Sequence, residues 1–471
     1  MSESLDVAII GAGTAGLAAL REVKKRTQRF LLINDGPWGT TCARVGCMPS
    51  KVLIEAANAF HRRGSFEVFG IRGAEELTVD LAAVLQRVRQ LRDDFVQGTL
   101  RTTEALGERA MAGRARFLGP GRLEVNGREL QARSIIIATG SRPIVPEGWR
   151  SLGERVLTTD TLFEQETLPG RIAVVGMGVI GVEIAQGLAR LGVAVTAFDR
   201  MQTVAGLTDP EVNRVALELL RRELPVHLGE DAELAADGQG VRVCAGDTEV
   251  VVDRVLAALG RRPNIDDLAL ETLGIDLDAR GMPAVDPATL QVADLPVFLA
   301  GDANGQAPLL HEAADEGHIA GLNATRRDLA CFERRTPLTV VFAGYGLAMV
   351  GQRFGDLAAG ECRIGEVRFE RQGRARAAQR NEGIMRLYAR PESGVLLGAE
   401  MCAPAAEHMA HLLALAIQRS LTVRDLLRMP FYHPTLEEGL RSALRELAAQ
   451  LPAGEESDLA SCGALNAEAL D

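Results

Sequence analysis

The 471-residue sequence predicts an α/β protein in which one βαβ arrangement occurs twice, followed by a separate α+β unit. Two apolar runs, residues 7–10 and 172–175, each lead directly into a glycine-rich turn. A short continuous apolar run is typical of a strand that is buried on both faces of a parallel sheet. From about residue 336 onward such turns cease, which indicates a change of architecture.

The elements of the two βαβ units follow in the same order. In the first unit, strand 7–10 precedes a helix that includes residues 17–20, and in the second, strand 172–175 precedes a helix that includes residues 184–188. Each unit has a closing strand that ends in glycine, at 135–140 and at 255–260. Because proline breaks regular structure, we expect the chain to cross between units near Pro143 and Pro263.

These breaks predict the domain division. The third unit contains a predicted strand at 338–342 and predicted helices at 407–418 and 436–451. The end of the chain, with five acidic and no basic residues, is expected to be flexible. The predicted division is a first nucleotide-binding domain of 1–143 and 264–335, a second of 144–263, an α+β domain of 336–451 and an acidic tail of 452–471.

Composition and charge limit the partners. The 47% of hydrophobic and 24% of charged residues are typical of a folded globular protein. No apolar run is long enough to span a bilayer, and the N-terminus lacks a basic region followed by an apolar stretch, so we expect a cytoplasmic protein without a membrane partner. A net charge of −11 disfavours nucleic acid as a partner.

The two glycine-rich turns have the spacing of dinucleotide-binding turns. In each, a strand is followed by Gly-x-Gly-x-x-Gly and then a helix, so backbone amides and the positive helix end can receive a pyrophosphate. One such turn alone could be purely structural, but the second copy in the same context favours nucleotide binding. The glycines are Gly11, Gly13 and Gly16 in the first turn and Gly176, Gly178 and Gly181 in the second.

The residue after the next strand indicates which nucleotide binds. Asp199 follows the predicted strand 193–198, where a carboxylate accepts hydrogen bonds from a ribose and repels a 2′-phosphate, which favours NAD. Arg200 could accommodate that phosphate or could be a solvated surface charge, so the strictness of the preference stays open. In the first unit Asn34 takes this position and Asp35 follows, and either could bind the ribose.

Seven cysteines are scattered along the chain, and Cys42 and Cys47 form the one closely spaced pair. Pro49 suits the first turn of a helix, which places Cys47 near a helix N-terminus with Lys51 close by. Both features lower a thiol pKa. The pair could form a redox-active disulfide, because a disulfide across so short a loop is readily reduced. A zinc site is one alternative, but it would need two further ligands. A pair of inert buried cysteines is the other.

His433 and Glu438 form a second candidate pair. With Pro434 and Thr435 between them, the imidazole would lie in a turn and the carboxylate in the following helix. A carboxylate that orients a histidine makes it a competent general acid and base near neutral pH. The alternative is a histidine that merely bonds to the start of a helix.

The segment 39–51, Gly-Thr-Thr-Cys-Ala-Arg-Val-Gly-Cys-Met-Pro-Ser-Lys, resembles the active-site segment of the dihydrolipoamide dehydrogenase and glutathione reductase family. These are FAD-dependent pyridine nucleotide-disulfide oxidoreductases of class I. The resemblance extends over about residues 5 to 450 and includes the motifs at 138–140, 299–302 and 433–438.

The resemblance implies roles for these residues. Cys47 would face the flavin as the charge-transfer thiol, and Cys42 would exchange with substrate. Lys51 would pair with Glu183 beside the flavin, although an acid early in a helix also favours the helix dipole. His433 and Glu438 would act on the cysteine pair of the partner subunit, which implies an obligate homodimer.

The resemblance also implies two cofactor sites, for FAD and NAD, and no metal. Asp302, at the end of a predicted strand, would bind the FAD ribityl chain, whereas a helix N-cap is its alternative role. The FAD site would comprise Gly11, Gly13, Gly16, Asn34, Asp35, Thr41, Lys51, Thr139, Gly140 and Asp302, and the NAD site Gly176, Gly178, Gly181, Asp199 and Gly260.

Oxidation of dihydrolipoamide by NAD⁺ is the reaction that the resemblance favours. Pro-Ser-Lys after Cys47 and Asp199 point to the lipoamide branch, whereas Phe431 replaces a histidine common there. Mercuric reductases need a C-terminal cysteine pair, and here Cys462 stands alone. The alternatives are a reductase of another low-molecular-weight disulfide and an FAD-bound protein with little lipoamide turnover. Whether the protein has a lipoyl-bearing partner protein, and which multienzyme complex it would belong to, are left open by the sequence.

Overall fold

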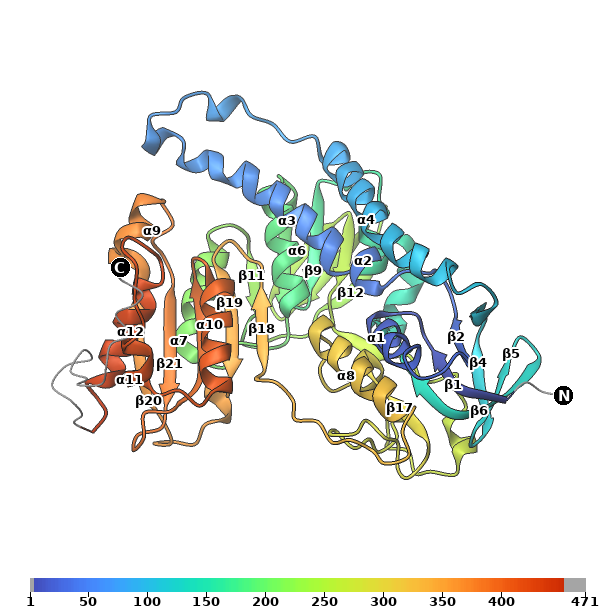
Figure 1. The fold of residues 1–471 in the computed structure, drawn as a ribbon. Helices are drawn as coiled ribbons and strands as arrows, with labels where there is room; N and C mark the ends of the chain where they lie inside the picture. Colours follow the sequence, from blue (N-terminus) through green and yellow to red (C-terminus); the bar gives the residue numbers. More distant parts are fainter. Residues whose placement is uncertain (1–3, 453–471) are drawn as a thin grey trace.

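A computed structural model describes residues 4–452. The predicted flexible tail therefore lies, apart from Pro452, outside the described residues, as does Cys462. Figure 1 shows the first nucleotide-binding unit beside the N-terminus, the second in the middle and the C-terminal unit on the opposite side. This arrangement of α/β and α+β units confirms the predicted fold class.

The first unit is built on a sheet of order β3-β2-β1-β6-β5-β4, with β17 beside β6. Ile10 lies opposite both Ile33 and Ile137 in parallel register, and residues 7–9 are fully buried, as their apolar run predicted. The strands are β1 Ser4–Ile10, β2 Phe30–Asn34, β3 Ala110–Ala112, β4 Ala115–Gly119, β5 Arg122–Val125, β6 Arg128–Ile137 and β17 Val297–Leu299.

Helices α1 and α8 lie close together against this sheet. A Cβ at Gly317 of α8 would come within 2.1 Å of the Ala15 carbonyl oxygen of α1, so only glycine permits this approach. The remaining two long helices, α3 and α4, form a hairpin along one edge of the molecule (Figure 1). The helices are α1 Thr14–Val23, α2 Thr41–Arg44, α3 Cys47–His61, α4 Leu81–Glu104 and α8 Leu310–Asn323.

The second unit repeats this plan with a sheet of order β11-β10-β9-β15-β8 and an antiparallel meander β12-β13-β14. The predicted strand 172–175 is confirmed, and the strand predicted at 193–198 is shifted by one residue. The elements are β8 Val156–Leu157, α5 Thr159–Leu162, β9 Arg171–Val175, α6 Val179–Arg190, β10 Ala194–Asp199, α7 Pro210–Arg221, β11 Val226–Leu228, β12 Glu233–Asp237, β13 Gly240–Ala245, β14 Thr248–Val252 and β15 Arg254–Ala257.

The chain passes between the two units on an antiparallel ribbon of β7 Ser141–Pro143 and β16 Arg261–Pro263. Arg142 lies opposite Arg262 in this ribbon. The matching Pro143 and Pro263 therefore end adjacent strands, and β17 and α8 then return to the first sheet. The domain bounds given above stay a prediction.

The C-terminal unit is an antiparallel sheet of order β18-β19-β22-β21-β20 that is covered on both faces. Met385 and Leu387 pack against α10 and α12, whereas the alternate residue Ile384 joins the core shared with the second unit. The elements are β18 Leu338–Val341, β19 Gly346–Gly351, β20 Arg363–Arg368, α9 Gly373–Ala377, β21 Ile384–Ala389, β22 Leu396–Ala403, α10 Ala406–Gln418, α11 Val423–Leu427 and α12 Glu438–Ala448.

The helix predicted at 436–451 is two residues shorter at its start and three at its end. The amide of Thr435 donates to the Glu438 carboxylate (3.1 Å), so the chain completes a turn before α12 begins at Glu438. The helix predicted at 407–418 is confirmed, with one more residue at its start.

Buried polar contacts dock the second unit on the C-terminal sheet. Asp209 caps the N-terminus of α7 and is fully buried, and it accepts hydrogen bonds from Arg386 (2.6 and 2.8 Å) and Tyr388 (2.9 Å) of β21. Glu400 of β22, also fully buried, accepts from the Asp209 amide (2.9 Å). Each buried charge thus has partners in the other unit, which fixes the orientation of the units.

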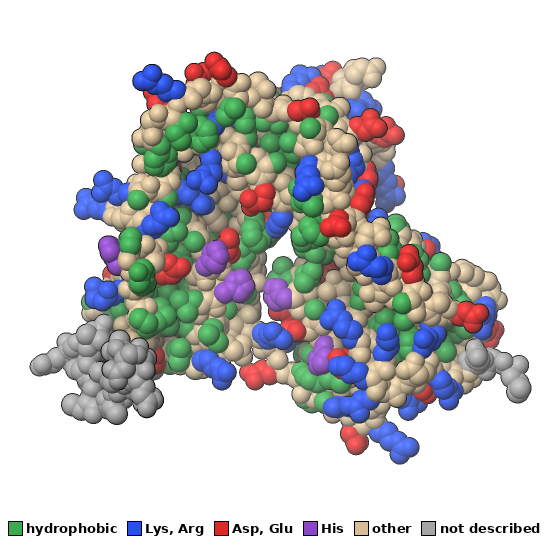
Figure 2. All heavy atoms as spheres, turned by 45° about the horizontal axis from the view of Figure 1, so that its top comes forward, with side chains coloured by type: hydrophobic (Ala, Val, Ile, Leu, Met, Phe, Trp, Pro, Cys, Tyr) green, Lys and Arg blue, Asp and Glu red, His purple; other side chains and the backbone are tan. Residues whose placement is uncertain are grey.

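The surface in Figure 2 carries acidic and basic side chains interspersed over the face shown, with apolar atoms between them. None of the helices within residues 4–452 has the length and apolar character needed to cross a membrane. The cytoplasmic location stays a prediction.

Candidate functional site

The first glycine of each Gly-x-Gly-x-x-Gly turn is required by the backbone. Gly11 and Gly176 have φ of +108° and +99°, which favours glycine. A Cβ at Gly11 would lie 2.2 Å from the Ala138 carbonyl oxygen, and one at Gly176 would lie 2.4 Å from that of Ala258. The residue that follows the closing strand of each unit is therefore in direct contact with the first glycine of the turn.

The middle glycine of each turn faces open space instead. Gly13 and Gly178 are the N-caps of α1 and α6, neither helix has a side-chain cap, and a Cβ at either glycine would meet no described atom within 4 Å. The uncapped amides at these helix starts are therefore accessible. A pyrophosphate can approach the backbone at both turns, as the sequence predicted.

Asn34 and Asp199 occupy equivalent positions in the two units. Asn34 Oδ1 accepts a hydrogen bond from the Ala12 amide (3.1 Å), and Asp199 Oδ2 accepts one from the Met177 amide (2.5 Å). Both contacts span 22 residues, from the end of the second strand to the second residue of the turn. The side chains thus lie beside the glycine turns, where a ribose would follow a bound pyrophosphate.

Asp35 and Arg200 are the neighbours of these residues, and Asp35 points elsewhere. Asp35 Oδ2 pairs with Arg114 Nε at 2.9 Å, and both side chains are largely exposed. Arg200 is exposed. Of the two candidates that the sequence left open in the first unit, Asn34 therefore has the geometry of Asp199.

The first unit fits FAD at the end of its closing strand. The hydroxyl of Thr139 is buried and has no hydrogen-bond partner among the described residues. A buried polar atom of this kind needs a partner, which a bound cofactor can supply. Gly140 follows with φ of +69°, and its counterpart in the second unit, Gly260, has φ of +95°.

Asp302 lies in the short 3₁₀ turn Gly301–Asn304 and not at the start of α8. The N-cap of α8 is Leu309, which excludes the N-cap role of Asp302 that was its alternative. Ser141 Oγ lies 2.7 Å from Asp302 Oδ2, and the contacts of Asp302 within residues 4–452 leave Oδ1 without a hydrogen bond. That oxygen can accept from a ribityl hydroxyl.

Cys42 and Cys47 lie on successive helices, Cys42 in α2 and Cys47 as the first residue of α3. The structure presents both as free thiols, with Cys42 half-buried and Cys47 exposed. A hydrogen bond from Cys42 and the positive charge of Lys51 together lower the pKa of Cys47 to about 6, against the opposing effect of burial. The same hydrogen bond and burial raise the pKa of Cys42 well above its usual range. Cys47 is therefore the thiolate of the pair.

Lys51 and Glu183 form the ion pair that the family resemblance implied. Lys51 Nζ lies 2.7 Å from Glu183 Oε2, and the Glu183 side chain is only 4% exposed. The other oxygen of Glu183 accepts from the Phe342 amide (3.0 Å), while the Lys51 ammonium lies 4.5 Å from the centre of the Phe342 ring. Residues from all three units thus meet one turn from Cys47.

Helices α3 and α6 run parallel and in register. Asn58 Oδ1 accepts from Arg190 Nη1 at 2.5 Å, and this pair and the Lys51–Glu183 pair are each separated by 132 residues along the chain. The same offset brings Cys47, the first residue of α3, level with Val179, the first residue of α6. The thiolate and the second nucleotide turn therefore lie at the same end of one helix pair (Figure 1).

His433 and Glu438 form the predicted dyad. His433 Nδ1 lies 3.0 and 3.2 Å from the two Glu438 oxygens, and the hydrogen bonds from His433 and from the Thr435 amide lower the pKa of Glu438. The His433 side chain is 80% exposed. Figure 1 places α12, which Glu438 begins, well away from α2 and the start of α3. The dyad is thus assembled in this chain but is not brought to its own cysteine pair.

Three residues of the site were missed by sequence reasoning. Phe342 contributes its amide to Glu183, and nothing in its local pattern distinguishes it from a strand residue. Ser141 contacts both Arg261 and Asp302, and Ser141 and Arg261 directly follow the matching glycines Gly140 and Gly260. Their equivalent positions after the two glycines were the sequence signal that could have identified them.

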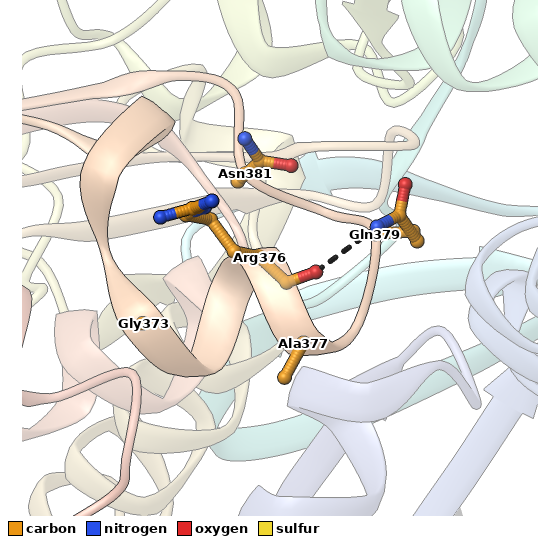
Figure 3. Close-up of a pocket in the computed structure, with 5 residues that line it drawn as sticks. All are labelled: Gly373, Arg376, Ala377, Gln379 and Asn381. Carbon is orange, nitrogen blue, oxygen red and sulfur yellow. Dashed lines mark hydrogen bonds between the residues drawn. The ribbon is translucent and has the colours of Figure 1, made fainter. Parts of the chain in front are cut away.

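A pocket of about 500 Å³ lies at α9, away from these residues (Figure 3). The side chain of Gln379 donates to the Arg376 carbonyl oxygen (3.2 Å) at its rim. It contains none of the predicted site residues. Within residues 4–452, no group of three His, Cys, Asp or Glu side chains is arranged to hold a metal ion.

These features define a protein with two dinucleotide-binding units and a paired-thiol centre between them. Residues 5–317 match the family described as pyridine nucleotide-disulphide oxidoreductase, and residues 338–444 match the dimerisation domain of that family. The chain therefore belongs to the pyridine nucleotide-disulphide oxidoreductases, whose members use FAD and NAD(H).

Relatives of known name include dihydrolipoyl dehydrogenases. The enzyme of Thermus scotoductus is 33% identical over 460 residues, which covers 95% of this chain and 98% of the relative. That of Bacillus subtilis is 31% identical, covering 93% and 98%. A mercuric reductase of Shigella flexneri is also 31% identical, covering 94% and 80%.

Solved structures show the same fold. LpdA from Mycobacterium tuberculosis has a TM-score of 0.79 at 25% identity, covering 94% of this chain and 99% of that one. The flavoprotein disulfide reductase RclA from Escherichia coli has a TM-score of 0.80 at 22% identity, covering 94% and 99%. The chain thus matches both solved structures over nearly their whole length.

Proposed function

We propose that the protein oxidises dihydrolipoamide with NAD⁺ through the Cys42–Cys47 pair and FAD. The observation that carries this proposal is the parallel α3–α6 pair, which holds the Cys47 thiolate and the second nucleotide turn at one end through the Lys51–Glu183 contact. Two-electron transfer between a dithiol and a nicotinamide needs both sites within reach of one flavin. FAD supplies the carrier of two electrons between the thiols and the nicotinamide.

The proposed cycle begins with the Cys42–Cys47 disulfide. A substrate thiolate attacks Cys42 Sγ, the bond to Cys47 breaks, and Cys47 leaves as a thiolate. Cys47 is the better leaving group, because the positive charge of Lys51 and the N-terminus of α3 stabilise its thiolate. The second substrate thiol then attacks the mixed disulfide, which releases lipoamide and leaves two thiols on the enzyme.

His433 would move the protons in these steps. Because Nδ1 is bonded to Glu438, Nε2 remains free to accept the substrate thiol proton. The exposed dyad suits a site completed by a second copy, and the matched dimerisation domain supports a homodimer. His433 and Glu438 would thus act on Cys42 and Cys47 of the partner subunit.

The cofactor assignments are part of the proposal. Gly13, Asn34, Thr139 and Asp302 would hold FAD, while Gly178 and Asp199 would hold the nicotinamide nucleotide. Asp199 favours NAD because its carboxylate would repel a 2′-phosphate.

Lipoamide is favoured as the substrate by the dihydrolipoyl dehydrogenase relatives. A second candidate function is reduction of another low-molecular-weight disulfide. The mercuric reductase relative and Phe431, which replaces a histidine common in the lipoamide branch, support it. The Phe431 ring lies 5.8 Å from the Arg441 guanidinium and is partly buried, whereas the neighbouring Tyr432 is 81% exposed. Tyr432, not Phe431, would therefore face an incoming substrate.

The test is NADH formation by the purified, FAD-loaded protein with dihydrolipoamide, beside a panel of other dithiols and with NADP⁺ in place of NAD⁺. We expect dihydrolipoamide and NAD⁺ to give the highest kcat/KM, and Cys42→Ser and His433→Ala to abolish turnover. Negligible turnover of the loaded wild-type protein with every dithiol would contradict the proposal and favour an FAD-bound protein with little catalysis.

A further inference from the structure

Ser141 holds one oxygen of Asp302 from the ribbon that joins the two nucleotide units. The Ser141 side chain is buried, its Oγ lies 2.7 Å from Asp302 Oδ2, and it belongs to β7. A serine hydroxyl has one proton, so it can bond to a carboxylate only when that proton points to the carboxylate. The orientation of the Ser141 hydroxyl therefore decides whether Asp302 is held.

Arg261 fixes that orientation. Its Nε donates to Ser141 Oγ at 2.8 Å, and its Nη2 donates to the Ser141 carbonyl oxygen at 2.7 Å. Because the guanidinium only donates, Ser141 Oγ must accept from Arg261 and can donate only to Asp302. The two-point contact also holds the serine backbone at a fixed distance from the guanidinium.

Arg261 comes from the second unit and differs from its neighbour. It begins β16, and its side chain is 16% exposed. Arg262, the next residue, is 57% exposed and pairs with Asp266 at the surface. Since successive residues of a strand point to opposite sides, only Arg261 reaches Ser141.

The turn that carries Asp302 is also held from its other side. Glu316 of α8 is buried and accepts from the Gly301 amide (2.6 Å) and from Asn304 (2.7 Å). The backbone of the turn is therefore fixed independently of Ser141. What Arg261 and Ser141 add is the rotation of the Asp302 carboxylate, with Oδ2 bonded and Oδ1 left for a ligand.

We infer that Arg261 is a positioning residue for FAD: it orients Ser141, which turns Asp302 towards the ribityl hydroxyls. The inference rests on the proposed placement of FAD against Asp302. It means that β16, in the ribbon that joins the two units, helps to form the FAD site. Displacement of β16 would therefore loosen FAD.

A double-mutant cycle on FAD binding tests this chain of contacts. The affinity of the cofactor-free protein for FAD is measured by quenching of flavin fluorescence in the Arg261→Ala, Ser141→Ala and double variants. Each single change is expected to weaken FAD binding about tenfold, the effect of one hydrogen bond to a charged group. Because both residues act through one contact, the double variant should be no weaker than either single variant.

Matched variants separate the outcomes. Arg262→Ala, on the same strand, is expected to leave FAD affinity unchanged, and Arg261→Lys to restore only part of it because lysine cannot make the two-point contact. Ser141→Ala removes only a hydroxyl and keeps the carbonyl bonded to Arg261, so it tests the contact in a folded protein. A roughly hundredfold, additive loss in the double variant would overturn the inference.

Asp302→Asn distinguishes this inference from the proposed function. If Asp302→Asn weakens FAD binding while Arg261→Ala and Ser141→Ala do not, the placement of FAD stands and the role of Arg261 is wrong. If Asp302→Asn leaves FAD affinity unchanged, the proposed placement itself is wrong, and the inference fails with it.

Discussion

Lys51 and Glu183 lie 2.7 Å apart although their helices belong to different nucleotide units. Glu183 is almost completely buried, so its charge requires the Lys51 ammonium and the Phe342 amide as partners. The pair lies one turn from Cys47 on α3 and one turn from the start of α6. It therefore links the thiol centre to the nucleotide turn of the second unit.

The ionisation of Cys47 should be visible in its reactivity. In the reduced protein, the hydrogen bond from Cys42 and the Lys51 charge lower the pKa of Cys47 to about 6. The thiolate is the reactive form, so the rate of alkylation should rise through pH 6 and level off near neutral pH. Peptide mass spectrometry after brief alkylation measures this rate. Cys42→Ala, which removes the donor, should move the midpoint upward; an unchanged profile would contradict the assigned hydrogen bond.

Lys51→Met and Glu183→Gln should change the pKa of Cys47 in opposite directions. Loss of Lys51 removes a positive charge and leaves the negative charge of Glu183, so the pKa of Cys47 should rise. Loss of the Glu183 charge should lower it. The alkylation profile measures both, and Lys25→Met, which removes a partner of Glu22 just after α1, serves as control. Shifts of the same sign in both variants would refute the electrostatic argument.

Mixed dimers test whether His433 acts across subunits. A subunit with Cys42→Ser and a subunit with His433→Ala are each inactive as homodimers. In a heterodimer of the two, one site combines an intact cysteine pair with an intact dyad, so about half of the wild-type activity per dimer should return. Differently tagged subunits allow the heterodimer to be purified. No recovery would place the dyad and the cysteines of one chain in the same site.

Asp199 should determine the nucleotide preference. Asp199→Ser removes the negative charge while keeping a hydrogen-bonding group, so the ratio of kcat/KM for NAD⁺ to that for NADP⁺ should fall about tenfold. Arg200→Ala is the matched neighbour and should change the ratio little, because Arg200 is exposed. If instead Arg200→Ala raises the ratio and Asp199→Ser leaves it unchanged, Arg200 faces the ribose.

Asp209→Ala should strongly destabilise the protein. The fully buried carboxylate has Arg386 and Tyr388 as partners, and its loss leaves the largely buried Arg386 guanidinium with only the longer contact to Glu366 at 3.4 Å. Breaking such a pair costs about 3 to 5 kcal/mol. Denaturant-induced unfolding measures the loss, and Asp237→Ala, at the exposed pair with Arg242, should cost at most about 1 kcal/mol. Equal effects would show that the buried contacts do not stabilise the docking.

The strands and glycine turns were predictable because they depend on local patterns. Residues 7–10 and 172–175 are apolar without interruption, and each is followed by glycines that the tight turn requires. By contrast, the choice between Asn34 and Asp35 depends on where β2 ends relative to the turn. One residue of register sends a side chain to the other face, and local sequence does not specify that register.

The contacts between units could not be predicted from local sequence patterns. Lys51 and Glu183 were paired only through the family resemblance, because 132 residues separate them. The start of α3, by contrast, was predictable, because Pro49 lies in its first turn as expected and Cys47 is its first residue. Ser141 and Arg261 were not anticipated, since their contact forms only when β7 and β16 pair.

The most direct measurement follows the two enzyme cysteines and the nucleotide in a single turnover without oxygen. The FAD-loaded disulfide form is mixed first with dihydrolipoamide, and NAD⁺ is then added. We expect Cys42 and Cys47 to become alkylatable after the first step and to return to the disulfide as one NADH forms per cysteine pair. NADH formation with Cys42 and Cys47 unchanged throughout, or in the Cys42→Ser protein, would contradict electron transfer through this pair.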